Sequence, residues 1–310
     1  MKGFILMRTV VITGATTGLG LRVAGRLAAQ GWHVVLGYRA ESRGEAAARQ
    51  IRRRTPAASL EPLRIDLADL RSVADAAGEL RRSGQRPPLH AIVGNAGVQI
   101  IDGVRRSADG YELTFATNHL GHHLLVAGLL DDLAAGARIA IVSSGTHWRE
   151  KSMGFPEPRW TSARELVDPS DADATPTAGR VRYSTSKLAN IYFVYELARR
   201  LDGRPISVNA YDPGLMPDTS LSRDYPTLVR TGFRMAAPLI SALLPGARSS
   251  RASARHLADL VSDARFDGTT GAYLEGPKIA PSSPESYDVA RAQQLWADSE
   301  QLIDQALARR

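Results

Sequence analysis

The sequence of 310 residues contains no cysteine, which excludes disulfide bonds and metal sites built from thiolates. It also lacks any apolar run close to the roughly 20 residues that a membrane-spanning helix requires. The first six residues, Met1 to Leu6, are too few for a signal peptide and contain no cleavage site, and Met7 is an alternative start. These features favour a cytoplasmic protein without a membrane span.

Aromatic residues make up only 6% of the chain, and the 32 acidic residues are outnumbered by 39 basic ones. The net charge of +7 comes largely from arginine and raises the question of a nucleic-acid partner. The arginines, however, are spread along the predicted helices and form no basic tract with interleaved aromatic residues. We therefore predict no nucleic-acid partner.

A glycine-rich turn lies between a short β-branched strand and a helix near the start of the chain. The strand is predicted at 9–13, the turn reads Gly14-Ala15-Thr16-Thr17-Gly18-Leu19-Gly20, and the helix continues through 21–31. A second strand at 33–37 follows at the distance expected of a βαβ unit. Glycines let the backbone approach a diphosphate, whose charge the exposed N–H groups and the helix dipole then hold. The segment predicts a nucleotide-binding site.

Predicted strands and helices alternate along the whole chain, which indicates a parallel sheet covered by helices on both faces. We predict a single Rossmann-type α/β domain over residues 1–310, a doubly wound parallel sheet of about seven strands. The later strands are predicted at 59–65, 90–94, 137–143, 206–211 and 272–275. The helices are predicted at 41–54, 69–83, 110–134, 181–202 and 249–262. An apolar stripe from Val289 to Leu307 predicts a C-terminal helix that docks on the domain or on a partner subunit.

Two segments interrupt this alternation. Residues 146–180 are rich in proline, aspartate, threonine and serine, and residues 215–248 carry an amphipathic run. Both follow the carboxyl ends of predicted strands, where open α/β sheets bind their ligands. We predict that they form the substrate pocket and its lid rather than plain solvated loops.

Tyr183 and Lys187 lie four residues apart in a predicted helix, so their side chains share one face. A phenol normally keeps its proton until about pH 10. A nearby ammonium favours the phenolate and lowers that pKa toward the working range. The pair therefore suits proton exchange with a carbonyl or an alcohol.

Together with the glycine turn, these residues make the sequence similar to the short-chain dehydrogenase/reductase family over nearly the whole chain. Thr13 to Gly20 matches its TGxxxGxG motif, and Pro213-Gly214 matches its PG motif. Asn95-Ala96-Gly97 matches its NAG motif. The positions of the family's catalytic tetrad are occupied, in order, by Asn118, Ser144, Tyr183 and Lys187. Motifs in this order are highly specific.

The resemblance implies an NADP(H)- or NAD(H)-dependent oxidoreductase that acts on a small-molecule ketone, aldehyde or secondary alcohol. Tyr183 would be the general acid/base, with Lys187 lowering its pKa and binding the nicotinamide ribose. Ser144 would hold the substrate oxygen, and Asn118 would support a water that relays protons to Lys187. The cofactor would be contacted by Gly14, Thr16, Thr17, Gly18, Leu19, Gly20, Asp66, Leu67, Asn95, Ala96, Gly97, Tyr183, Lys187, Pro213 and Gly214.

The choice of cofactor depends on the end of the second predicted strand, Leu36-Gly37-Tyr38-Arg39. A site selective for NAD usually has a carboxylate there to bind the ribose diol, and this segment has none. The Arg39 guanidinium could instead bind a 2′-phosphate and stack on the adenine. We therefore predict NADP(H) as the cofactor.

Several motifs resemble the branch that contains retinol dehydrogenases and protochlorophyllide reductases. They are Asn118-His119-Leu120-Gly121-His122, Ser143-Ser144 and the tail from Asp288 to Glu300. Protochlorophyllide reductase has a functional cysteine just after its PG motif, where this chain has Leu215. We therefore keep that light-driven enzyme only as an alternative.

A second alternative is a non-catalytic NADP(H)-binding regulator on the same fold, which the presence of Ser144, Tyr183 and Lys187 disfavours. His119, His122 and His123 form a cluster without further ligands at metal-binding spacing. We interpret them as packing residues and predict no metal. The sequence leaves the substrate, the direction of the reaction and homo-oligomer formation open.

Overall fold

A computed structural model describes residues 7–82, 86–148, 155–170, 173–216 and 248–309. Its centre is one eight-stranded sheet with the strand order β3-β2-β1-β4-β5-β6-β7-β8. The first seven strands are parallel and β8 is antiparallel to β7. The strands are β1 (Thr9–Ile12), β2 (His33–Tyr38), β3 (Leu60–Arg64), β4 (Leu89–Gly94), β5 (Leu133–Val142), β6 (Ile206–Asp212), β7 (Ala272–Glu275) and β8 (Lys278–Ala280).

The sheet confirms the predicted doubly wound α/β fold, with one strand more than the seven expected. The additional strand β8 has only three residues, and it returns along β7 after a turn at Gly276, whose φ is +60°. So short a segment has too few residues to show an alternating pattern, which is why the sequence does not reveal it.

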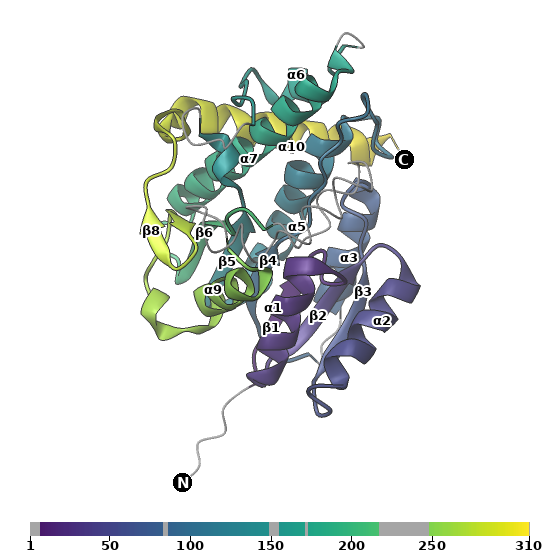
Figure 1. Ribbon diagram of the computed structural model, residues 1–310, viewed down its shortest axis with the longest axis vertical. Coiled ribbons are helices and arrows are strands. Elements are labelled where there is room, and N and C mark those ends of the chain that lie inside the picture. Colours follow the sequence, from purple (N-terminus) through teal and green to yellow (C-terminus); the bar gives the residue numbers. More distant parts are fainter. Residues whose placement is uncertain (1–6, 83–85, 149–154, 171–172, 217–247, 310) are drawn as a thin grey trace.

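Helices cover both faces of the sheet (Figure 1). They are α1 (Gly18–Ala29), α2 (Glu41–Arg52), α3 (Leu70–Arg82), α4 (Leu113–Phe115), α5 (Gly121–Leu129), α6 (Ala163–Leu166), α7 (Pro176–Arg200), α9 (Ser250–Ser262) and α10 (Val289–Ala308). One hydrophobic core joins α1 and α9 to the sheet, and a second joins α3, α5 and α7 to its other face. Among the described helices, none is long and apolar enough to cross a bilayer.

Helix α7 begins at Pro176, five residues before the predicted start. The Thr175 hydroxyl accepts a hydrogen bond from the Ala178 N–H at 3.2 Å, and proline occupies the first turn. A threonine cap followed by proline is a common signal for the start of a helix. Residues 176–180, which we assigned to an insertion, are therefore the first turn of the helix that carries Tyr183. The predicted lid at 215–248 lies almost entirely outside the described residues.

Helix α10 forms a further layer over α7 and α5 (Figure 1), and the predicted docking on the body of the domain is confirmed. The Trp296 ring stacks on Phe193 with centroids 5.6 Å apart, and the Arg200 guanidinium lies 4.4 Å from the Trp296 ring centroid. Below this layer, His119 contacts the Ser299 hydroxyl at 2.9 Å. The described residues contain no cluster of metal ligands.

His119, His122 and His123 are at most 2% exposed, and burial lowers the pKa of each. The pKa falls to about 4 for His122 and to about 3 for His123. Because the unfolded chain takes up protons near the ordinary value of 6.5, and the native protein does not, stability is lost as the pH falls through that value.

We predict that His123→Phe reduces this acid sensitivity. Phenylalanine suits the apolar pocket of His123, and it removes one group that must stay neutral in the native state. Between about pH 7 and pH 5, the free energy of unfolding should fall by about 1–2 kcal/mol less in the variant than in the native protein. Urea titrations at both pH values measure this difference. Equal losses in the two proteins would contradict the interpretation.

Candidate active site

The glycine-rich turn after β1 leaves the first turn of α1 open to an anion. Gly14 and Gly18 have φ values of +62° and +54°, and a Cβ on Gly20 would lie 2.4 Å from the Gly14 carbonyl oxygen. The cap residue Thr17 makes no side-chain hydrogen bond to the helix, and the first turn has no acidic residue. Free N–H groups at a helix start fit a diphosphate, so these residues suit a dinucleotide.

The strand order reverses between β1 and β4, and polar groups join the two strand ends there. The Thr13 hydroxyl accepts hydrogen bonds from the N–H groups of Asn95 and Ala96 at 2.9 and 3.0 Å. The Asn95 side chain donates in return to the Thr13 carbonyl oxygen at 2.9 Å. Ligands of open α/β sheets bind in the crevice at such a reversal. The predicted residues Gly14 and Asn95 to Gly97 therefore lie together at this reversal.

Asn118 is fully buried in a five-residue π-helical turn, Ala116–Leu120, between α4 and α5. Its side-chain oxygen accepts from the Val98 N–H at 2.8 Å, and its amide donates to the Val98 carbonyl oxygen and the Ser186 hydroxyl, both at 3.0 Å. Single π turns in α-helices often mark functional sites. The amide thereby ties the NAG segment to the residue that precedes Lys187.

Tyr183, Lys187 and Ser144 lie together at the carboxyl end of β5. The Lys187 ammonium donates to the Val142 carbonyl oxygen at 3.1 Å and lies 5.6 Å from the centroid of the Tyr183 ring. The Ser144 side chain lies beside Tyr183 and acts to lower the pKa of its phenol. Gly97 leaves room beside them, since a Cβ there would lie 3.6 Å from the Lys187 nitrogen and 3.2 Å from the Asn118 oxygen. The structure thus brings all four predicted tetrad residues into one site.

The electrostatics of the pair differ from the expectation based on Lys187 alone. Burial raises the pKa of the Tyr183 phenol above its ordinary value of 10.0, and the Asp212 carboxylate raises it further, whereas the Ser144 side chain lowers it. Burial lowers the pKa of Lys187 to about 8, against the effect of Asp212. Desolvation therefore dominates both pKa values, and the prediction that Lys187 lowers the pKa of Tyr183 in this site is wrong.

Asp212, at the end of β6, is a buried carboxylate of this site that the sequence analysis missed. It accepts hydrogen bonds from the Gly214 N–H at 2.8 Å and from the Tyr273 hydroxyl at 2.9 Å. Burial raises its pKa, while these two donors oppose the rise. An acidic residue directly before the PG motif was the available signal. Asp212 places negative charge beside both Tyr183 and Lys187.

The other predicted cofactor residues lie at the carboxyl ends of neighbouring strands. Arg39 follows β2 and is exposed, and Asp66 follows β3, where its side chain accepts from the Ala68 N–H at 3.0 Å. Leu67 is buried against Gly121, whose Cβ would lie 2.6 Å from the Leu67 carbonyl oxygen. Pro213 and Gly214 follow β6, beside Asp212. Arg39 and Asp66 thus follow β2 and β3, on the other side of β1 from the strands β4 and β5 beside the tetrad.

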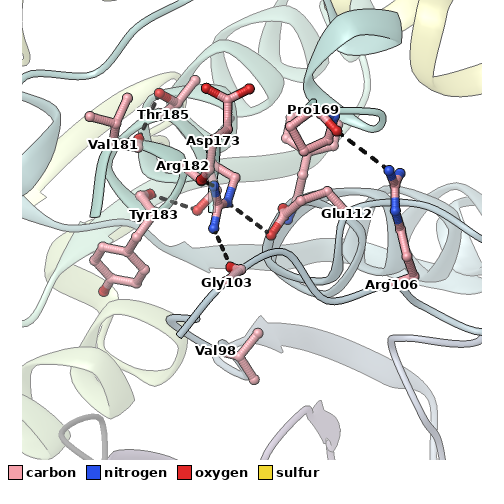
Figure 2. Close-up of polar contacts among 12 residues, drawn as sticks. Val98, Gly103, Arg106, Glu112, Pro169, Asp173, Val181, Arg182, Tyr183 and Thr185 are labelled. Carbon is pink, nitrogen blue, oxygen red and sulfur yellow. Dashed lines mark hydrogen bonds and ion pairs between the residues drawn. The ribbon is translucent and has the colours of Figure 1, made fainter. Parts of the chain in front are cut away.

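Arg182, which precedes Tyr183, holds three segments at the start of α7, and the sequence analysis missed it too. Its guanidinium donates to the carbonyl oxygens of Asp173 at 2.6 Å and Gly103 at 2.7 Å, and lies 3.4 Å from the fully buried Glu112 carboxylate. Figure 2 shows it between Glu112 and Gly103, with the Tyr183 ring pointing away. Glu112 also accepts from the Phe115 N–H at 2.7 Å. The cluster fixes the loop after the NAG segment against the helix that carries Tyr183.

The sheet order and the glycine turn at the junction of β1 and β4 are typical of a dinucleotide-binding α/β protein, and comparisons with known proteins agree. Residues 8–154 match the family model for short chain dehydrogenases. The WW domain-containing oxidoreductase of Danio rerio is 33% identical over 305 residues, covering 96% of this chain and 69% of the relative. Human retinol dehydrogenase 13 is 32% identical, covering 97% and 86%. The chain belongs to the short-chain dehydrogenase/reductase family, a family of oxidoreductases with nicotinamide cofactors.

Solved structures show the same fold. A short-chain dehydrogenase/reductase from Serratia marcescens superposes with a TM-score of 0.63 at 23% identity, covering 88% of this chain and 98% of that protein. A blue fluorescent protein from a metagenomic library, in complex with NADPH, superposes with a TM-score of 0.61 at 22% identity, covering 87% and 97%. These structures support the Rossmann-type fold.

We predict that Arg182→Met destabilises the protein far more than Arg106→Met. The first change leaves the Glu112 carboxylate buried without its cation, which costs about 3 kcal/mol or more. Arg106 bonds to the Val167 carbonyl and pairs with Asp168, but both charged side chains are solvent-exposed, at 39% and 76%. Its loss should cost about 1 kcal/mol or less. Chemical denaturation measures the free energy of unfolding of both variants. Similar losses in the two variants would show that the Arg182 cluster stabilises the protein no more than an exposed ion pair does.

Proposed function

We propose that the protein is an NADP(H)-dependent oxidoreductase that interconverts a ketone or aldehyde with an alcohol. The observation that carries the proposal is the convergence of Asn118, Ser144, Tyr183 and Lys187 beside the open glycine turn. A bound nicotinamide would supply or accept the hydride. The protein would orient the substrate against the nicotinamide and supply the proton.

Tyr183 is the proposed proton donor. A phenol is protonated at neutral pH, so Tyr183 would give its proton to the carbonyl oxygen as the hydride adds to the carbonyl carbon. In the opposite direction it would accept the proton of the alcohol. The Ser144 hydroxyl would donate to the same oxygen while negative charge develops there. Lys187 and Asn118 would return the proton to Tyr183, with Asn118 supporting a water next to the lysine.

The substrate is proposed to be bulky and apolar. The ring of Phe155 lies 6.1 Å from the ring of Tyr183, so an aromatic side chain borders the reacting group. Phe155 belongs to the segment 146–180, whose described part we propose as one wall of the substrate pocket. The name of the related retinol dehydrogenases agrees with a bulky apolar alcohol.

Arg39 supports the choice of NADP(H) over NAD(H). It directly follows β2, which ends in Tyr38, so no carboxylate occupies the position that would bind a ribose diol. An exposed guanidinium can turn toward a 2′-phosphate and form charge-assisted hydrogen bonds.

We predict that the native protein binds NADPH more tightly than NADH and that Arg39→Ala removes most of the difference. One lost charge-assisted contact corresponds to about 1.5–3 kcal/mol, or roughly ten- to a hundredfold in NADPH affinity. Arg53→Ala, at the far end of α2, is the matched control and should bind both cofactors as the native protein does. Fluorescence titrations measure all affinities, and equal binding of the two cofactors by the native protein would refute the assignment.

We predict that Tyr183→Phe abolishes chemistry and leaves cofactor binding intact. The change removes one proton and almost no volume, so turnover should fall by at least roughly a hundredfold at an unchanged NADPH affinity. Tyr192→Phe, in the same buried helix, removes a hydroxyl that donates to the Glu285 carbonyl and lies outside the tetrad, so this variant should keep its turnover. Steady-state kinetics with a ketone found by screening provide the test. A Tyr183→Phe protein with near-native turnover would show that another group supplies the proton.

A further inference from the structure

His122 lies on α5, one turn after Asn118, and is 2% exposed. Its Nδ1 lies 3.0 Å from the Asn118 carbonyl oxygen, and its Nε2 lies 2.9 Å from the Thr13 hydroxyl. One imidazole therefore touches both the backbone of the proposed proton-relay residue and the threonine that begins the glycine turn. From the sequence alone, His122 is interpreted only as a packing residue.

The partners of the ring determine its protonation. A carbonyl oxygen only accepts, so Nδ1 must carry the proton that it shares with Asn118. The Thr13 hydroxyl already accepts from two backbone N–H groups, so its own proton is available for Nε2, and its other acceptor, the Val93 carbonyl oxygen, is more distant at 3.4 Å. A neutral ring with its proton on Nδ1 thus gives a hydrogen-bond partner to the Asn118 carbonyl oxygen, to the Thr13 hydroxyl and to both ring nitrogens.

Two further observations agree with this neutral ring. Burial lowers the pKa of His122 to about 4, and the nearby Lys187 ammonium also disfavours a charge on the ring. Gly94 at the end of β4 makes room for the imidazole, because a Cβ there would lie 3.1 Å from a ring carbon. The site accommodates the ring at the junction of β1, β4 and α5.

We propose that His122 is a positioning residue that couples the nucleotide turn to the π-helical turn of Asn118. Through Thr13 it is linked to the N–H groups of Asn95 and Ala96, and through the Asn118 carbonyl to the helix that carries the proton relay. A shift of either element breaks a hydrogen bond of the same ring, so cofactor binding and the placement of Asn118 depend on one another. The inference rests on the proposed function.

His123 provides a matched control at the next position. It is equally buried and packs against Trp296 and Phe193 with centroids 4.6 and 5.1 Å away, but neither of its ring nitrogens has a hydrogen-bond partner among the described residues. His123 therefore contributes apolar packing, whereas His122 acts through its two hydrogen bonds.

The test compares His122→Phe, His122→Gln and His123→Phe. Phenylalanine keeps an aromatic filler and removes both hydrogen bonds, whereas glutamine keeps one donor and one acceptor. We expect His122→Phe to weaken NADPH binding and to lower turnover, each by roughly tenfold, because two buried polar groups lose their partner. His122→Gln should lie between that variant and the native protein, and His123→Phe should match the native protein within about twofold.

If His122→Phe binds NADPH more tightly and turns over faster than His122→Gln, His122 contributes only packing. That result would overturn the proposal. If His122→Phe does not fold, the proposal is tested by the glutamine variant and by the tautomer of His122 in the native protein. Side-chain nitrogen NMR should show a neutral ring protonated on Nδ1 at neutral pH, without any cofactor, and a proton on Nε2 would overturn the coupling. A native protein that shows this tautomer but binds no NADPH would refute the proposed function and leave the hydrogen-bond assignment intact.

Discussion

The reversal of strand order between β1 and β4 is the constraint on which the remaining site depends. Two parallel strands end side by side there, and their chains leave toward opposite faces of the sheet. The Thr13 hydroxyl and the Asn95 side chain satisfy the backbone groups that this separation would leave unpaired. The glycine turn, the NAG segment and, through His122, the helix of Asn118 all extend from this junction.

Burial is the second constraint on the site, because it shifts the pKa values of Tyr183 and Lys187 more strongly than their charged neighbours do. The sequence predicts that Lys187 lowers the pKa of Tyr183, yet desolvation shifts the pKa of each residue toward its neutral form. Asp212 opposes this shift in the lysine and reinforces it in the tyrosine. The result is a protonated phenol next to a lysine with a pKa of about 8, so Tyr183 holds the proton that the reduction of a carbonyl would require.

The residues that could be predicted from the sequence are those whose role follows from local pattern. The β-branched run and glycines at 9–20 identify β1, its turn and α1, because strand period and backbone freedom are local properties. The spacing of Tyr183 and Lys187 likewise places both on one face of α7. The position of Asp212 before the PG motif was a local signal, but the contacts of Asp212, Arg182 and His122 could not be predicted this way. Their roles depend on partners more than sixty residues away in the chain, such as Tyr273, Glu112 and Thr13.

The central claim is that this cofactor crevice and the Tyr183 site perform a hydride transfer together. The most direct measurement uses NADPH deuterated at C4 of the nicotinamide and a panel of bulky apolar ketones and aldehydes, with mass spectrometry of the products. The account predicts an alcohol that carries one deuterium on the former carbonyl carbon. Tight binding of NADPH without deuterium transfer to any member of the panel would contradict it and would favour a non-catalytic NADP(H)-binding protein.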